Sequence, residues 1–135
     1  MKPLISITIA IYNVAEFVAL SMECLVGQTY RHTEIICIDD GSTDGTLDIL
    51  KEFERNDRRI KVIAKKQNEG LAVARNEALS LAQGKYVAFL DGDDLYDLVL
   101  FEKAVELAEQ EKSDVVVWDY STFYEECQIN NLSNK

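Results

Sequence analysis

Cysteine, histidine and proline are scarce in this 135-residue sequence, and each scarcity narrows what the protein can be. The cysteines Cys24, Cys37 and Cys127 are odd in number and form no C-x-x-C pair, which excludes a familiar zinc framework and indicates a reducing compartment. The one histidine, His32, lies in a polar connection, so no Ser-His-Asp or Cys-His catalytic set can be assembled around it. With one proline, six glycines and no long polar tract, the chain is expected to fold rather than stay disordered.

Basic residues are also few: 14 Lys and Arg stand against 24 Asp and Glu, giving a formal net charge of −10. A nucleic-acid surface needs a basic stripe, so we expect no nucleic-acid partner. The acidity by itself is explained by a solvated surface that aids solubility. It does not exclude an anionic ligand, because a bound metal ion can invert the local field.

The longest apolar run near the N-terminus, residues 4–11, is too short for a membrane helix and too strand-like for a signal peptide. We therefore expect a cytoplasmic protein. A membrane-bound acceptor or partner is compatible with this expectation and would place the protein peripherally at the inner membrane face.

Short β-branched runs alternate with segments of helical spacing along most of the chain. The expected strands are residues 6–11, 34–38, 60–64, 86–90 and 115–118. Two of the expected helices are residues 14–26 and 98–111. Between them, one helix is expected to be capped by Ser42 or Thr43 and to carry Leu47, Leu50 and Phe53, and another is expected to begin at Gly70. Because the strands are apolar throughout, they predict an α/β fold with a mostly parallel sheet covered by helices on both faces. Residues 1–124 are expected to form one domain, and residues 125–135 an irregular tail or truncation point.

Polar residues follow the expected strands at the points where they end. Tyr12-Asn13 follows the first strand, Asp39-Asp40 the second and residues 91–94 the fourth, while residues 68–75 form the loop after the third. Right-handed crossovers bring the carboxyl ends of parallel strands to one edge of the sheet, where ligands of open α/β folds bind. The sequence therefore predicts a binding site at this edge.

The segment Asp91-Gly92-Asp93-Asp94 places three carboxylates within four residues. Such crowding is costly unless a cation neutralises it, and carboxylate oxygens suit Mg²⁺ or Mn²⁺. Gly92 would let the backbone turn tightly or approach a ligand closely. The structural alternative is an acidic turn in which Asp93 or Asp94 caps the following helix.

Other binding motifs are absent or incomplete. Residues 39–45 resemble the start of a calcium loop, but counting Asp40 as the first ligand puts Lys51 at the twelfth position, where a bidentate Glu is required. Neither G-x-G-x-x-G nor G-x-x-x-x-G-K-[ST] occurs, so dinucleotide and P-loop cradles are missing. Arg75, a little over one turn inside an expected helix, suits a phosphate, and equally suits a surface ion pair with Glu69, Glu77 or a site aspartate.

Taken together, the motifs resemble those of the family 2 glycosyltransferases. The matching stretches occur in the family's order and cover roughly residues 6–97: they are residues 6–13, 28–30, 34–45, 68–76 and 84–94. The resemblance implies a GT-A fold and sugar transfer, usually with inversion, from a nucleotide-diphosphate sugar, with UDP a family-level expectation, in polysaccharide or glycoconjugate synthesis. The acceptor would be an unidentified sugar, lipid-linked molecule or protein.

The same resemblance assigns roles to individual residues. It implies donor binding by Ala10, Tyr12, Asp40, Arg75, Asp91 and Gly92, and metal binding by Asp93 or Asp94 within a DXD motif. The family often has proline where Ala10 stands and serine where Gly92 stands, and both departures leave the carboxylates intact. An inverting displacement needs a general base, which in the family lies further along, so we expect it beyond Lys135.

Two other function classes stay open at this point. A nucleotidyltransferase also uses aspartates and Mg²⁺, but it would want a Gly- and Lys/Arg-rich loop after the first strand, where this chain reads Tyr12-Asn13-Val14-Ala15-Glu16. A non-catalytic nucleotide-sugar-binding domain would explain the absence of the acceptor half from this sequence.

Overall fold

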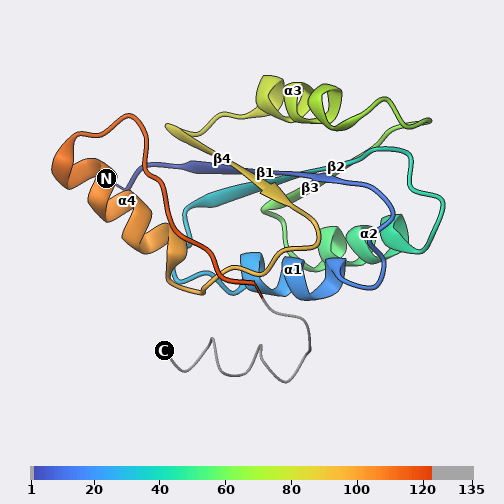
Figure 1. Ribbon diagram of the computed structural model, residues 1–135, viewed down its shortest axis with the longest axis horizontal. Helices are drawn as coiled ribbons and strands as arrows, with labels where there is room; N and C mark the ends of the chain where they lie inside the picture. The colour runs from blue at the N-terminus through green and yellow to red at the C-terminus, as the bar shows by residue number, and fades with distance from the viewer. Residues whose placement is uncertain (1, 123–135) are drawn as a thin grey trace.

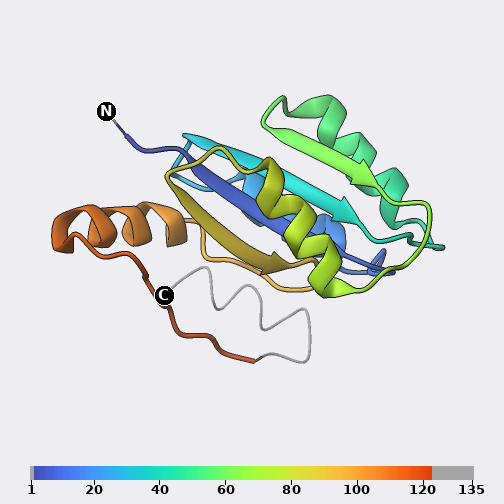
Figure 2. The same ribbon diagram turned by 90° about the horizontal axis from the view of Figure 1, so that it is seen from above.

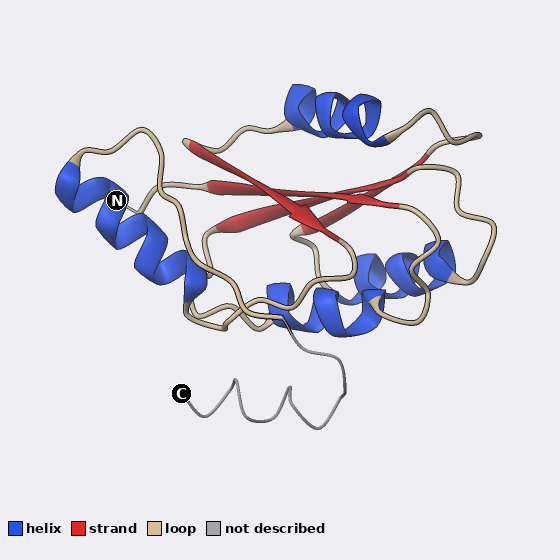
Figure 3. Ribbon diagram, in the orientation of Figure 1, coloured by secondary structure: helices blue, strands red, loops and turns tan. Residues whose placement is uncertain are grey.

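The computed structural model describes residues 2–122 and shows one parallel β-sheet between two layers of helices (Figure 1, Figure 3). In chain order the elements are β1 (Ile5–Ile11), α1 (Val18–Val26), β2 (Thr33–Asp39), α2 (Thr46–Asn56), β3 (Ile60–Ala64), α3 (Leu71–Leu81), β4 (Tyr86–Asp91) and α4 (Leu100–Glu111).

The sheet has the order β3-β2-β1-β4, and every pair of neighbouring strands is parallel. β1 is central, pairing with β2 on one side and β4 on the other, and all seven of its residues are buried. A strand covered on both faces gains most from apolar β-branched residues, which explains the continuous run rather than an alternating pattern. The predicted α/β class and parallel sheet are confirmed.

Helices α1, α2 and α4 lie on one face of the sheet and α3 lies on the other (Figure 1). The larger core cluster joins the sheet to these three helices through Met22, Leu25, Leu50 and Phe101, all at most 2% exposed. Opposite, α3 packs on the strands (Figure 2). Its small residues, buried Ala74 and Ala78 among them, form a second cluster with residues of β1 and β2. Alanines let this helix approach the sheet closely.

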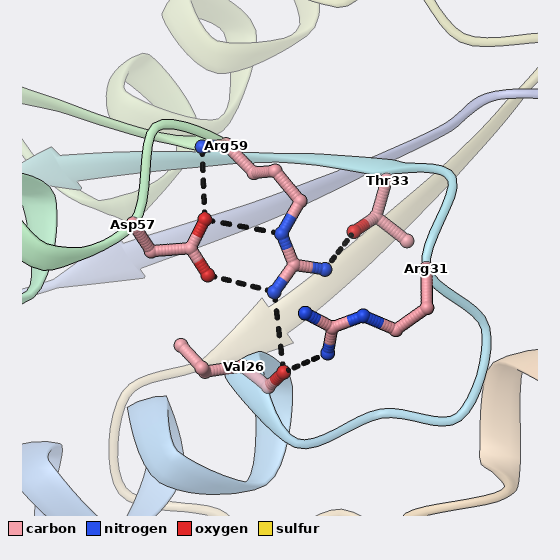
Figure 4. A network of polar contacts seen from close by, with 5 residues as sticks. All are labelled: Val26, Arg31, Thr33, Asp57 and Arg59. Atoms are coloured by element: carbon pink, nitrogen blue, oxygen red, sulfur yellow. Dashed lines mark hydrogen bonds and ion pairs between the residues drawn. The ribbon is translucent and has the colours of Figure 1, made fainter.

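A polar network joins the elements at the amino ends of the strands, away from the predicted site (Figure 4). The Arg59 guanidinium forms two hydrogen bonds with Asp57, Nη2 to Oδ2 at 2.7 Å and Nε to Oδ1 at 3.1 Å. It also donates to Thr33 Oγ1 and to the Val26 carbonyl, each at 3.2 Å. The Arg31 guanidinium donates to the same Val26 carbonyl at 2.7 Å. Two cations at the last carbonyl of α1 suit the negative end of the helix dipole.

Two sequence-based boundaries need correction. The predicted helix 14–26 begins only at Val18, because residues 15–17 form a turn instead, in which the Phe17 N–H donates to the Val14 carbonyl at 2.9 Å. Side chains at the start of α2 and just before it hold this turn: Thr46 Oγ1 accepts from Val14 at 3.0 Å and Asp44 Oδ2 from Ala15 at 3.2 Å. The predicted cap of α2 by Ser42 or Thr43 is wrong. The helix begins at Thr46, whose N–H donates to Asp44 Oδ1 at 2.9 Å.

The predicted fifth strand, residues 115–118, is also wrong for the described part of the chain, since these residues form no strand and Val115 and Val117 are 76% and 85% exposed. A β-branched run becomes a strand only when a neighbouring strand accepts its backbone hydrogen bonds. The expected tail, residues 125–135, lies outside the described residues. Within residues 2–122 no helix combines the length and apolar character needed to cross a membrane.

Candidate functional site

The fold brings four sequence-predicted side chains to the carboxyl edge of the sheet. Tyr12 directly follows β1, Asp40 directly follows β2, Asp91 ends β4, and Arg75 on α3 donates from Nη2 to Asp91 Oδ1 at 3.1 Å. Ala10, 9% exposed, is the register partner of Asp91 in the β1–β4 pair. Residues 81 positions apart in sequence thus become neighbours, as the parallel topology requires.

Asp40 is 3% exposed and both of its carboxylate oxygens are engaged. Oδ1 accepts the Glu69 N–H at 3.0 Å and Oδ2 accepts the Gly70 N–H at 2.9 Å. Lys65 Nζ lies 3.6 Å from Asp40 Oδ1, 3.0 Å from a Glu69 carboxylate oxygen and 4.0 Å from one of Glu77, with only 8% of its side chain exposed. Asp40 therefore fixes the loop that leads into α3, besides standing at the predicted base pocket.

The loop after β1 is locked to the loop after β2 through Asn13, which adopts a left-handed backbone with φ 49°. Its N–H donates to Ser42 Oγ at 3.0 Å, its Nδ2 donates to Thr43 Oγ1 at 3.3 Å, and its Oδ1 accepts the Thr43 N–H at 2.8 Å. Asparagine tolerates this conformation better than most residues. The lock fixes the backbone next to Tyr12, whose side chain is 46% exposed and accessible to a ligand.

Gly41 lets the loop after β2 lie directly against the loop before α3. Its φ is 78°, and a Cβ there would lie 2.7 Å from the backbone nitrogen of Asn68 and from the carbonyl carbon of Gln67. A side chain at this position is excluded for two reasons: its Cβ would collide with backbone atoms, and the positive φ is unfavourable for any residue other than glycine. Glycine at position 41 thus allows the contact through which Asp40 reaches the α3 loop.

The carboxylates after β4 are crowded and accessible. The Asp91 side chain is 47% exposed and that of its partner Arg75 is 40% exposed, while Asp93 and Asp94 are exposed residues. Partial desolvation, followed by the charges of Asp93 and Asp91, raises the pKa of Asp94. The crowding predicted from the sequence is therefore present, and a bound cation would relieve it.

Gly92 packs against β1 and the loop after it. A Cβ at Gly92 would lie 3.0 Å from Ile11 Cγ1 and 3.2 Å from Val14 Cγ2, so a larger residue would push the acidic loop outward. The prediction was that Gly92 allows the backbone to approach a ligand closely. In the structure, the backbone at Gly92 approaches the side chains of Ile11 and Val14 closely.

The described residues gather no set of three His, Cys, Asp or Glu side chains that forms a complete metal cage. One or two carboxylates from residues 91–94 are the donors available. Such a sparse set fits Mg²⁺ or Mn²⁺, which are commonly held by one or two carboxylates with substrate phosphates completing the coordination.

The structure also tests the alternatives left open by the sequence. Asp93 and Asp94 do not cap the next helix, since α4 begins at Leu100, with Asp97 Oδ1 accepting the Val99 N–H at 2.9 Å. Among the partners considered for Arg75, the one observed is the site aspartate Asp91.

Two residues near the site were not singled out from the sequence. Lys65 directly follows β3, and a charged residue at the end of an apolar strand was a usable signal. Tyr96 is buried, with its hydroxyl against the backbone of Asp91, and no spacing rule indicated that contact.

Known proteins resemble this chain over most of its length. The sequence model of the family described as "Glycosyl transferase family 2" matches residues 6–133. WfaP of Escherichia coli, described as a UDP-Glc:alpha-D-GlcNAc-diphosphoundecaprenol beta-1,3-glucosyltransferase, is 41% identical over 121 residues, which make up 90% of this chain and 46% of WfaP. Glycosyltransferase GlyG of Streptococcus pneumoniae is 34% identical over 125 residues, 93% of this chain and 42% of GlyG.

Solved structures agree on the fold. The crystal structure of S. aureus TarS 1-349 in complex with UDP-GlcNAc matches with a TM-score of 0.77 and 29% identity, covering 84% of this chain and 33% of that one. The mannosyltransferase PcManGT from Pyrobaculum calidifontis, in complex with GDP-Man and Mn²⁺, matches with a TM-score of 0.74 at 24% identity over 80% of this chain and 33% of that one. The chain thus spans less than half the length of each of these relatives.

Proposed function

The chain belongs to glycosyl transferase family 2, and on that premise we propose that it forms the donor-binding part of a glycosyltransferase that uses a nucleotide-diphosphate sugar, with UDP as the nucleotide. The observation that carries the proposal is the meeting of Tyr12, Asp40, Arg75 and Asp91 at the carboxyl edge of the sheet. The relatives TarS and WfaP support the choice of UDP through the donors in their descriptions.

We assign the nucleoside to the side of the site formed by Tyr12 and Asp40. The exposed Tyr12 ring offers a flat apolar surface on which a base can stack. Asp40 already binds two backbone N–H groups, and each carboxylate oxygen can accept more than one hydrogen bond, so it keeps capacity for a base N–H. Ala10 contributes backbone beside them.

We assign the ribose and diphosphate to Arg75 and the residues 91–94. Arg75 uses its Nη2 for a contact with Asp91, and its side chain is 40% exposed, so the guanidinium keeps accessible donors for a phosphate. Asp91 holds that guanidinium in place. Asp93 and Asp94 would hold Mg²⁺ or Mn²⁺, which as a Lewis acid would stabilise the negative charge that develops on the departing nucleotide diphosphate.

The whole protein's reaction follows from family membership as a proposal. We propose transfer with inversion to a sugar acceptor, lipid-linked in keeping with the diphosphoundecaprenol-linked acceptor in the description of WfaP, in polysaccharide synthesis. Such an acceptor would bring the protein to the cytoplasmic face of a membrane. Family membership favours this reaction over nucleotidyl transfer, which the aspartates alone would also allow.

The proposal is tested by calorimetric titration of the chain with UDP, GDP, CDP and dTDP, first with Mn²⁺ and then with EDTA. We expect UDP to bind in the presence of metal, and Asp93→Asn to weaken that binding by about tenfold or more, because a candidate metal ligand loses its charge. Asp114→Asn, at an exposed position beyond the end of α4, is the matched control and should bind as the wild type does. Equal affinity in all three proteins would remove Asp93 from the site, and binding of no nucleotide would contradict the donor-site assignment.

A further inference from the structure

The hydroxyl of Tyr96 binds both backbone groups of a single residue, Asp91. It donates to the Asp91 carbonyl at 2.6 Å and accepts the Asp91 N–H at 3.1 Å. Tyr96 is 9% exposed, so these bonds form away from bulk water. A phenol that holds the N–H and the C=O of one residue fixes the orientation of both adjoining peptide units, and with them the direction in which the side chain leaves the backbone.

Helix α1 and the segment that follows it hold the rest of the same loop, again through its backbone atoms. The Ser21 hydroxyl donates to the Asp94 carbonyl, and Gln28 Nε2 donates to the Asp97 carbonyl at 2.7 Å. Both Ser21 and Gln28 are fully buried. Together with Tyr96 they hold the main chain of residues 91, 94 and 97, while none of the three binds the carboxylate of Asp91, Asp93 or Asp94.

This separation of tasks matters because the three carboxylates repel one another. Without a held backbone, the loop would relax by moving its charges apart, and a cation would then have to collect them again on binding. A backbone held by neutral buried partners keeps the carboxylates close together, with Asp91 paired to Arg75 and with Asp93 and Asp94 left to bind a cation. Groups behind a ligand set commonly determine its affinity in this way.

We propose that Tyr96 is the positioning residue of this loop, residues 91–97, and holds Asp91 in the orientation that pairs it with Arg75 and completes the metal and diphosphate subsite. The inference rests on the proposed function, since it concerns the same site. It adds a residue that does not itself touch the nucleotide.

The test is Tyr96→Phe, which removes one oxygen and leaves the ring. Tyr30→Phe is the matched control: Tyr30 is likewise buried, at 4% exposed, and its hydroxyl also donates to a backbone carbonyl, that of Pro3, near the opposite end of the sheet. UDP binding is measured for both variants at a series of Mn²⁺ concentrations and in EDTA. Losing two hydrogen bonds predicts that Tyr96→Phe weakens Mn²⁺-dependent UDP binding by about 5- to 30-fold and raises the Mn²⁺ concentration needed for half-maximal binding.

Residual binding in EDTA should be unchanged, and Tyr30→Phe should match the wild type throughout. A merely structural role for Tyr96 would instead lower the melting temperature of Tyr96→Phe and leave its Mn²⁺-dependent UDP binding unchanged, which would overturn the inference while the proposed function stands. If the wild type itself shows no Mn²⁺-dependent UDP binding, the proposed function fails and this inference with it. Should Tyr96→Phe not fold, Ser21→Ala tests whether the held backbone of this loop sets the Mn²⁺ dependence. It removes one hydrogen bond and should weaken Mn²⁺-dependent UDP binding by about 2- to 10-fold, and an unchanged Mn²⁺ dependence would overturn the inference.

Discussion

Replacing Asp40 by asparagine should destabilise the fold far more than the same replacement at Asp91, although both aspartates lie at one edge of the sheet. Asp40 is 3% exposed and accepts the N–H groups of Glu69 and Gly70, one with each oxygen. Asparagine keeps a single acceptor oxygen, so its NH₂ group must face one of these backbone N–H groups.

The expected size follows from those contacts. A hydrogen bond to a charged group contributes about 1.5–3 kcal/mol, and one such bond is lost outright at Asp40 while the other loses its charge. Lys65 also loses a carboxylate partner but keeps Glu69 at 3.0 Å, which limits the penalty of leaving a buried cation. We expect Asp40→Asn to lower the free energy of unfolding by about 2–4 kcal/mol, a large part of the roughly 5–15 kcal/mol typical of a whole domain.

The control is Asp91→Asn. The Asp91 side chain is 47% exposed, and that of its partner Arg75 is 40% exposed. Solvent screening limits such a pair to about 0–1 kcal/mol. Urea unfolding followed by circular dichroism gives both free energies on one scale. Equal losses for Asp40→Asn and Asp91→Asn would refute the view that Asp40 holds the α3 loop.

Three further outcomes follow from the structure. Gly41→Ala should lower the free energy of unfolding in urea by about 3 kcal/mol or more, because the new Cβ would collide with backbone atoms at 2.7 Å. Gly70→Ala should lower it by only about 1–2 kcal/mol, the strain of the backbone at φ 100°, because the Cβ there would meet no atom within 4 Å. Equal losses for the two variants would contradict this difference. Hydrogen bonding to the Arg59 side chain lowers the pKa of Asp57, so the stability that Asp57 contributes is present above its unfolded pKa of about 3.9 and is lost as pH falls through the lower folded value. Asp57→Asn should therefore lower the melting temperature at pH 7 and do so much less near pH 2, and a loss independent of pH would contradict the assignment. Burial raises the pKa of the fully buried Cys37 thiol, so Cys37 should react with a thiol reagent, followed by peptide mass spectrometry, only after unfolding; labelling in the native state would contradict its place in the core.

The order of strands and helices was predictable from the sequence because apolar β-branched runs and helical spacing report directly on burial. The strand predicted at 60–64 matches β3, and the other three confirmed strands differ by at most one residue at either end. The start of α1 was not predictable from its own residues. The N–H groups of Val14 and Ala15, in the turn that precedes it, bind the side chains of Thr46 and Asp44, about 30 residues away. The run at 115–118 has strand composition, but composition alone does not supply a partner strand.

The location of the candidate site was predictable for a topological reason, since parallel strands bring their carboxyl ends to one edge. The contacts within it were not. That Asp40 holds the α3 loop, and that Tyr96 holds the backbone of Asp91, depends on how loops pack after folding. Sequence reasoning named the charged candidates for a ligand site, and overlooked Tyr96, the buried neutral residue whose hydroxyl binds the backbone of Asp91.

The measurement that tests the donor-site assignment most directly is amide chemical-shift mapping of the ¹⁵N-labelled chain during titration with UDP in the presence of Mg²⁺. The account predicts shifts concentrated at the carboxyl edge of the sheet, in the backbone around Tyr12, Asp40, residues 68–75 and residues 91–94, with the network around Arg59 unaffected. Shifts gathered around Arg59 at the amino ends of the strands, or none at all at saturating UDP and Mg²⁺, would contradict it.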